Sequence, residues 1–229
     1  MATINAIVGV GSGLSASLAR LLAKEGFKIA LAARQVDKLD GLSTEIGAIS
    51  FQADASNPDD VNRLFSKVEQ QLGTPTVVIY NPSWRIRGAL IDLDPAEVAK
   101  TIKITAYGGF LVAQAAAKLQ LKAGGGAIFF TGASASVKGY SLSAPFAMGK
   151  FALRGLAQSI ARELAPQNIH VAHFVIDGAI RSATRIKPDD KPDSFLDPDA
   201  IAQTYLNILR QPRNAWTWEV ELRPWVEPF

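Results

Sequence analysis

The stretch of sequence that decides the fold is residues 4–18, which read INAIVGVGSGLSASL. It opens with a mainly apolar run without polar alternation, passes through three glycines, and then places Leu14 and Leu18 on one helical face. A run of this kind is typical of a strand buried on both faces, and a helix directly after it is typical of a βαβ unit. Residues 4–18 therefore predict a strand, a tight turn and a helix of a parallel α/β sheet.

The same alternation of short apolar runs and longer amphipathic stretches continues along the chain. An alternating apolar and polar run over 216–222 predicts an edge strand or a strand packed against a neighbouring subunit. Residues 183–198 hold three prolines and seven charged residues and predict a mobile loop beside the substrate. No linker divides the chain, so residues 1–229 are expected to form a single domain, a doubly wound (Rossmann) parallel sheet with helices on both faces. Strands are predicted at about 4–10, 28–33, 48–53, 76–80, 127–131 and 170–176, and helices at about 13–25, 36–46, 57–72, 95–122 and 144–164.

Composition excludes several classes of function. The 229 residues carry 24 Lys and Arg against 21 Asp and Glu, and no basic run suggests a nucleic-acid partner. No stretch is apolar enough to span a membrane, and the first residues do not resemble a signal peptide. The absence of cysteine suits the cytoplasm, where we expect this protein. His170 and His173 lie three apart on a predicted strand and point to opposite faces, so no metal site is expected.

The glycine turn predicts a site for a pyrophosphate. The common spacing G-x-G-x-x-G fails because Leu14 occupies its last position, but G-x-x-x-G-x-G fits through Gly9 and Gly13 with Ser15 in the final place. Glycines allow the backbone to approach a phosphate closely, and the following helix offers free N–H groups. A plain tight turn is the alternative interpretation.

The end of the second predicted strand indicates which dinucleotide binds. NAD sites carry an acid there for the ribose hydroxyl, whereas NADP sites carry a cation for the 2′-phosphate. Here the run 29–33 ends in Arg34 and Gln35, with no acid before Asp37. Arg34 therefore predicts a preference for NADP(H) over NAD(H), unless it is only a solvated residue at a helix entry.

With these features in place, the chain resembles the short-chain dehydrogenase/reductase family. The motif Gly9-x-x-x-Gly13-x-Ser15 is followed by Asp54 in the position of the adenine acid and by Lys150 in the position of the Lys of Tyr-x-x-x-Lys. The resemblance implies a seven-stranded sheet of order 3-2-1-4-5-6-7, with the nicotinamide near the segment 177–182. The predicted cofactor-binding residues are Gly9, Gly13, Leu14, Arg34, Asp54, Asn81, Lys150, Ile180 and Ser182.

The chain departs from the family where the catalytic residues belong. Phe146 stands four residues before Lys150, where the family has the tyrosine that exchanges a proton with the substrate. Thr105 stands in the place of a helical asparagine. The family's serine maps to Ala133 or, with a shift of one residue, to Ser134. The predicted catalytic residues are therefore Lys150, which orients the cofactor, and Ser134, which binds the substrate oxygen.

A missing general acid weakens catalysis without abolishing it. Such an acid contributes a factor of about 10²–10⁴ to the rate, and hydride transfer can survive its loss when the cofactor is well oriented. Tyr140, Ser134, Ser136 or a water held by Lys150 could supply the proton instead.

The leading prediction is an NADP(H)-dependent oxidoreductase that transfers hydride between nicotinamide and a small carbonyl or alcohol substrate. A nucleotide-binding or regulatory protein without turnover, derived from such an enzyme, is the second prediction, and a scaffold that binds no nucleotide is the third. Gly108 and Gly109 interrupt a predicted helix, so close helix packing is expected there. Because this helix commonly lies at a subunit interface in the family, a homodimer or homotetramer is expected.

Overall fold

A computed structural model describes residues 3–182 and 193–227. Its main sheet has seven parallel strands in the order β3-β2-β1-β4-β5-β6-β9, which confirms the predicted order. The seventh strand of the sheet is β9 because two short strands, β7 (Ala179–Ile180) and β8 (Phe195–Leu196), precede it in the chain. The strands of the main sheet are β1 (Ile4–Val8), β2 (Lys28–Ala33), β3 (Ile49–Gln52), β4 (Val77–Tyr80), β5 (Gly126–Thr131), β6 (Ile169–Ile176) and β9 (Glu219–Leu222).

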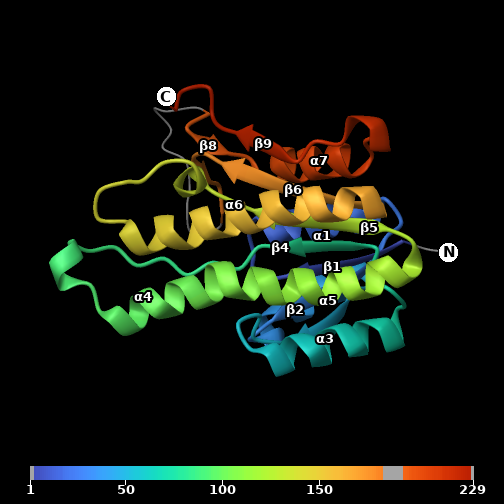
Figure 1. Cartoon of the computed structure of the whole chain (residues 1–229). Coiled ribbons are helices and arrows are strands. Elements are labelled where there is room, and N and C mark those ends of the chain that lie inside the picture. Colours follow the sequence, from blue (N-terminus) through green and yellow to red (C-terminus); the bar gives the residue numbers. More distant parts are fainter. Residues whose placement is uncertain (1–2, 183–192, 228–229) are drawn as a thin grey trace.

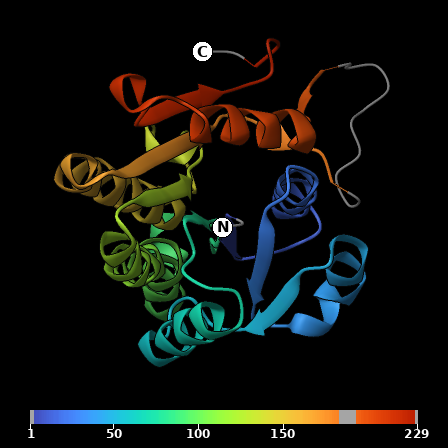
Figure 2. The same ribbon diagram turned by 90° about the vertical axis from the view of Figure 1, so that its right-hand side faces the viewer.

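Helices cover both faces of this sheet, as predicted (Figures 1 and 2). One apolar cluster packs under α3 (Pro58–Gln71), α5 (Gly108–Ala123) and α6 (Ala144–Leu164). A second cluster packs on the opposite face under α1 (Leu14–Lys24), α2 (Asp40–Ile46) and α7 (Pro198–Leu209). Strands β1, β4 and β6 are buried along their whole length, which explains why their sequences are almost continuously apolar.

The long helix predicted over 95–122 contains an irregular turn. It begins as α4 (Pro95–Ile102), passes through a π-helical turn at Lys103–Tyr107 and continues as α5. The two glycines after this turn pack as expected. A Cβ on Gly109 would lie 2.5 Å from Leu153 of α6, and one on Gly108 would strike the Tyr80 hydroxyl. Only glycine allows this approach, which offsets its low helix propensity.

The C-terminal part differs from the prediction in two places. Phe195–Leu196, near the end of the predicted loop 183–198, forms the short strand β8, which pairs with β7 (Ala179–Ile180). Residues 183–192 of that loop lie outside the described part. Helix α7 was not predicted. Strand β9 lies at the end of the sheet order, which confirms the predicted edge strand. No helix in the described ranges is long and apolar enough to cross a membrane.

Candidate cofactor and active site

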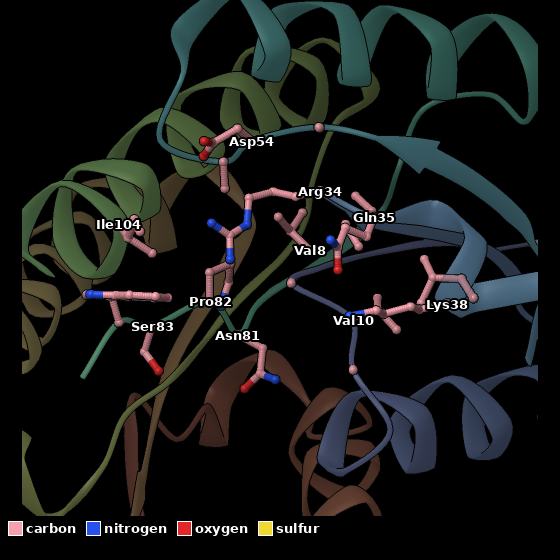
Figure 3. A pocket seen from close by; sticks show the side chains of 18 of the residues that line it. Val8, Val10, Arg34, Gln35, Lys38, Asp54, Asn81, Pro82, Ser83 and Ile104 are labelled. Atoms are coloured by element: carbon pink, nitrogen blue, oxygen red, sulfur yellow. The ribbon is translucent and has the colours of Figure 1, made fainter. Parts of the chain in front are cut away.

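A crevice lies along the carboxyl ends of β3, β2, β1 and β4 (Figure 3). This is where the strand order reverses, the usual ligand position in a doubly wound sheet. The cavity measures about 770 Å³. Each of the four strands contributes residues that directly follow it. The lining comprises Val8, Gly9, Val10, Gly11, Ser12, Ala32, Ala33, Arg34, Gln35, Lys38, Leu39, Ala53, Asp54, Ala55, Asn81, Pro82, Ser83, Trp84 and Ile104.

A small hydrogen-bond network holds the glycine turn against the loop after β4. The Asn81 side chain donates to Ser15 Oγ at 2.7 Å, and Ser15 Oγ donates to the carbonyl oxygen of Gly9 at 3.1 Å. Gly9 has a φ of +81°, and a Cβ on it would lie 2.5 Å from Pro82. Glycine is therefore required at position 9 by both conformation and space. Asn81, predicted as a cofactor residue, lines the crevice and braces the turn.

The start of α1 is suited to an anion. Gly13 is its N-cap, no side chain caps the helix, and the first turn contains no acid. Open space surrounds the positions that a Cβ would occupy on Gly11 and Gly13. Leu14 is buried in the apolar cluster under α1, so only its backbone N–H could face a ligand. The free N–H groups and the positive end of the helix favour a phosphate at this turn.

Two cations line the crevice beyond the end of β2. Arg34 projects into the cavity from the end of β2 (Figure 3). Lys38, on the short 3₁₀ helix Val36–Leu39, lines the same cavity and was missed by the sequence analysis. Its spacing of four residues from Arg34 is the feature that could have indicated it. Both cations lie where an NADP site would hold the 2′-phosphate.

Asp54 follows β3 and faces the same end of the crevice. It accepts hydrogen bonds from Ser56 N at 2.9 Å and from Ser56 Oγ at 2.7 Å. Burial alone would raise the pKa of Asp54, but these bonds and the charges of Arg34 and Lys103 outweigh burial and hold the pKa below its usual range. The carboxylate is thus ionised and fixed in a turn at the predicted adenine position.

Lys150 does not line this cavity but is buried beside the end of β5. Its Nζ donates to the carbonyl oxygen of Thr131 at 2.7 Å. Burial lowers the pKa of Lys150 to about 8. An ammonium has three N–H donors, and this bond uses one of them.

The ring of Phe146 lies near two positively charged groups of the protein. The ring centre is 5.9 Å from Lys150 Nζ and 5.2 Å from the guanidinium carbon of Arg85. Arg85 belongs to the loop that leaves β4, the same loop that contributes Asn81 and Trp84 to the crevice. Arg85 was not predicted from the sequence, because nothing in its local sequence connects it to α6.

The π-helical turn connects this loop to α6. Trp84 N donates to Thr105 Oγ1 at 3.3 Å, and Thr105 is buried. A Cβ on Gly149 would lie 3.0 Å from Thr105, so the turn packs directly beside the residue that precedes Lys150. Tyr80 donates its hydroxyl to the carbonyl oxygen of Ile104, and burial raises its pKa. Thr105 therefore supports the loop rather than reaching the crevice, whose lining includes Ile104 instead.

The remaining predicted proton donors differ in their environments. Ser134 begins the 3₁₀ turn Ser134–Ser136 after β5 and is half-buried. Ser136 is fully buried, and its Oγ accepts from Ala133 N at 3.1 Å. Tyr140 is 45% exposed and lies beside Lys138. None of the three lines the described crevice.

The segment after β6 is held by charge. Asp177 is buried and pairs with Lys138 at 3.2 Å and with Arg223 at 3.5 Å. Ile180 pairs with Leu196 in the small sheet, and Ser182 follows at the edge of the described range. The structure therefore places the predicted nicotinamide segment near β5 and the C-terminal strand, outside the cavity that contains Arg34.

The two histidines of β6 have structural surroundings. His170 stacks on Trp216 at 4.7 Å between ring centres. His173 is buried with Nδ1 3.0 Å from Glu219, and burial lowers its pKa to about 4. Glu219 is also held by Arg154 through two bonds of 2.6 and 2.7 Å. Among the described residues, no group of three or more acids or histidines could hold a metal ion.

Comparison with known proteins places this geometry in a family. The family model described as short chain dehydrogenase matches residues 3–192. An uncharacterized oxidoreductase of Staphylococcus aureus is 28% identical over 230 residues, covering 96% of each chain. The crystal structure of a short-chain dehydrogenase from Rhodopseudomonas palustris is 35% identical and superposes with a TM-score of 0.84, covering 97% of this chain and 99% of that one.

A metagenomic short-chain oxidoreductase solved in complex with NADP is 25% identical, with a TM-score of 0.84 and 97% coverage of both chains. The fold, the crevice and these relationships together define the class, an oxidoreductase with a dinucleotide-binding sheet. The chain belongs to the short-chain dehydrogenase family.

Proposed function

We propose that this protein is an NADP(H)-dependent oxidoreductase that interconverts a small carbonyl compound and its alcohol. The observation that carries the proposal is the position of Arg34, which enters the crevice at the end of β2 beside Lys38. After β2, two cations and no acid line the crevice before Ala53, which suits a 2′-phosphate better than a ribose hydroxyl. The open space above Gly11 and Gly13 and the cavity of about 770 Å³ fit the adenosine and pyrophosphate of a dinucleotide, whose nicotinamide extends beyond this cavity toward Lys150.

The residues of the crevice and those beyond the end of β5 have distinct roles in this proposal. Backbone N–H groups at the start of α1, including that of Leu14, bind the pyrophosphate, and Asp54 faces the adenine. When bound, the nicotinamide donates or accepts a hydride. Lys150 has N–H donors beyond the one that Thr131 uses, and these hold the ribose next to the nicotinamide. Ile180 and Ser182 lie against the nicotinamide, and Ser134 binds the substrate oxygen.

The proton does not come from Phe146, whose ring has none to give. Its place one helical turn before Lys150 suits an apolar wall for the substrate. Water is the simplest proton source, at a cost of part of the factor of about 10²–10⁴ that a positioned acid contributes. A slow reductase is therefore expected.

The experiment is the consumption of NADPH with a panel of uncharged aldehydes and ketones, compared with the Lys150→Met variant. The proposal expects slow turnover by the wild type and a loss of at least about tenfold in the variant. No turnover by the wild type with any member of the panel would contradict an enzymatic role.

A second candidate function is a nucleotide-binding protein without turnover, and the observation that favours it is Phe146. It predicts quenching of tryptophan fluorescence by NADPH without consumption of NADPH. Trp84 lines the crevice and provides the fluorophore.

We further propose one domain, a cytoplasmic location and assembly as a homodimer or homotetramer through α5 and α6. The support for assembly is a set of large apolar side chains that are 41–51% exposed on these helices and the turn before them. These side chains are Tyr107, Phe110, Leu121, Met148 and Phe151. Light scattering that finds a monomer at micromolar concentration would contradict the assembly.

A further inference from the structure

The loop that leaves β4 brings a cation to Phe146. The guanidinium carbon of Arg85 lies 5.2 Å from the centre of that ring, and Lys150 Nζ lies 5.9 Å from it. Arg85 is exposed, so its side chain is accessible to a ligand. A cation over an aromatic ring is attracted by the negative face of the ring, which favours one orientation of the side chain.

Trp84, the residue before Arg85, is held through both its backbone and its side chain. Trp84 N donates to Thr105 Oγ1 at 3.3 Å, and Trp84 Nε1 donates to Glu97 at 2.8 Å. Lys100 lies 4.1 Å from the centre of the indole ring and pairs with Glu97 at 2.9 Å. Glu97 is thus already bound to Trp84 and Lys100, and Arg85 extends from an anchored residue.

No carboxylate of the described residues forms an ion pair with Arg85. Its five N–H donors remain available, and a guanidinium keeps its charge at any pH that proteins tolerate. The group cannot act as an acid, but it can stabilise negative charge that develops on an oxygen.

From this juxtaposition we propose that Arg85 is a catalytic residue that donates hydrogen bonds to the substrate's carbonyl oxygen beside the ring of Phe146. This inference rests on the proposed function. In this role Arg85 stabilises the negative charge on the substrate oxygen and does not donate a proton. The substrate is a carbonyl compound, and its carbonyl oxygen, not a remote anionic group, contacts the guanidinium.

The step balances with NADPH as the reductant. The carbonyl carbon gains a hydride with its electron pair from the dihydronicotinamide, and the π electrons of the C=O bond move onto oxygen. The resulting alkoxide is held by the N–H groups of Arg85 and takes a proton from water, which leaves hydroxide for the buffer to neutralise. Arg85 keeps all its protons throughout. The products are the alcohol and NADP⁺.

The test compares Arg85→Gln and Arg85→Lys with the matched control Arg87→Gln, which removes an exposed arginine two residues further along the same loop. On an uncharged ketone, kcat is expected to fall about 100-fold in Arg85→Gln. It should fall less in Arg85→Lys, which keeps the charge but loses the planar set of N–H donors of the guanidinium. Arg87→Gln should stay within about twofold of the wild type. The NADPH dissociation constant, measured by tryptophan fluorescence, should be unchanged in all three.

A second arm repeats Arg85→Gln in a Phe146→Tyr background, where a phenol can supply the proton. There the loss caused by Arg85→Gln should shrink below about tenfold, because two groups that serve one oxygen are not additive. Equal kcat values for Arg85→Gln and Arg87→Gln would overturn the assignment while leaving the proposed function intact.

A third arm compares a 2-oxo acid with its methyl ester. An effect of Arg85→Gln confined to KM for the acid would overturn the assignment in favour of an anchor for a substrate carboxylate. Absence of turnover in the wild type with every substrate would contradict the proposed function and this assignment together.

Discussion

The Phe146 ring stands one helical turn before Lys150, 5.9 Å from its ammonium nitrogen. A second cation, Arg85, has its guanidinium carbon 5.2 Å from the centre of the same ring. The only hydrogen bond recorded for the buried ammonium among the described residues is the one to the carbonyl oxygen of Thr131. This arrangement holds positive charge next to an apolar ring that cannot itself donate a proton, and several expectations depend on it.

The first prediction concerns the pH dependence of stability. Burial lowers the pKa of Lys150 from 10.5 to about 8, so between these values the unfolded chain binds more protons than the folded one. Stability contributed through this group therefore rises as pH increases from about 8 to about 10.5. In Lys150→Met this rise disappears, and the difference between the two proteins changes by about 3 kcal/mol across the window. Urea denaturation of the cofactor-free proteins at pH 7 and 10.5 measures it, and parallel pH profiles would contradict it.

The second prediction concerns a restored phenol. Phe146→Tyr places a hydroxyl one helical turn before Lys150, whose charge lowers the pKa of that phenol and makes it a better proton donor. We expect carbonyl reduction to accelerate by at least about tenfold, with about 10⁴ as the ceiling. The control is Phe151→Tyr, a change at a residue of the same helix that is 44% exposed. Equal rates for both variants would show that position 146 does not face the reacting oxygen.

The third prediction separates two glycines of the phosphate turn. Gly9→Ala introduces a Cβ that would lie 2.5 Å from Pro82 at a φ of +81°, whereas nothing lies within 4 Å of a Cβ on Gly11. Gly9→Ala should lower the free energy of unfolding by about 2 kcal/mol or more, and Gly11→Ala by less than about 0.5 kcal/mol. Chemical denaturation of the two variants decides this. Similar losses of unfolding free energy in both variants would contradict this prediction and would mean that the turn shifts to accommodate the Cβ at position 9.

Much of the fold follows from local sequence because each strand is a short apolar run and each crossover is an amphipathic helix. Strand β6 is buried throughout, and its sequence is correspondingly apolar. The π-helical turn at Lys103–Tyr107 was not foreseen, because it depends on packing against Gly149 and Tyr80 from distant parts of the chain. Pairing of Ile180 with Leu196 was missed for the same reason.

The site could be predicted where it follows strand ends. Arg34 and Asn81 each follow a strand directly, Asp54 is the second residue after β3, and all three line the crevice. Lys38 and Arg85 reach their positions through a helical turn and a loop whose courses no local pattern reveals. The positions of these two side chains near the site could be seen only in the tertiary structure.

Calorimetry of NADPH and NADH binding to the wild type and to Arg34→Asp tests whether Arg34 holds the 2′-phosphate. We expect tighter binding of NADPH by the wild type. We also expect a loss of about 10- to 100-fold in NADPH affinity for the variant, because a charge-assisted bond to phosphate contributes about 1.5–3 kcal/mol. No heat with either coenzyme, tighter binding of NADH by the wild type, or unchanged NADPH affinity in the variant would contradict it.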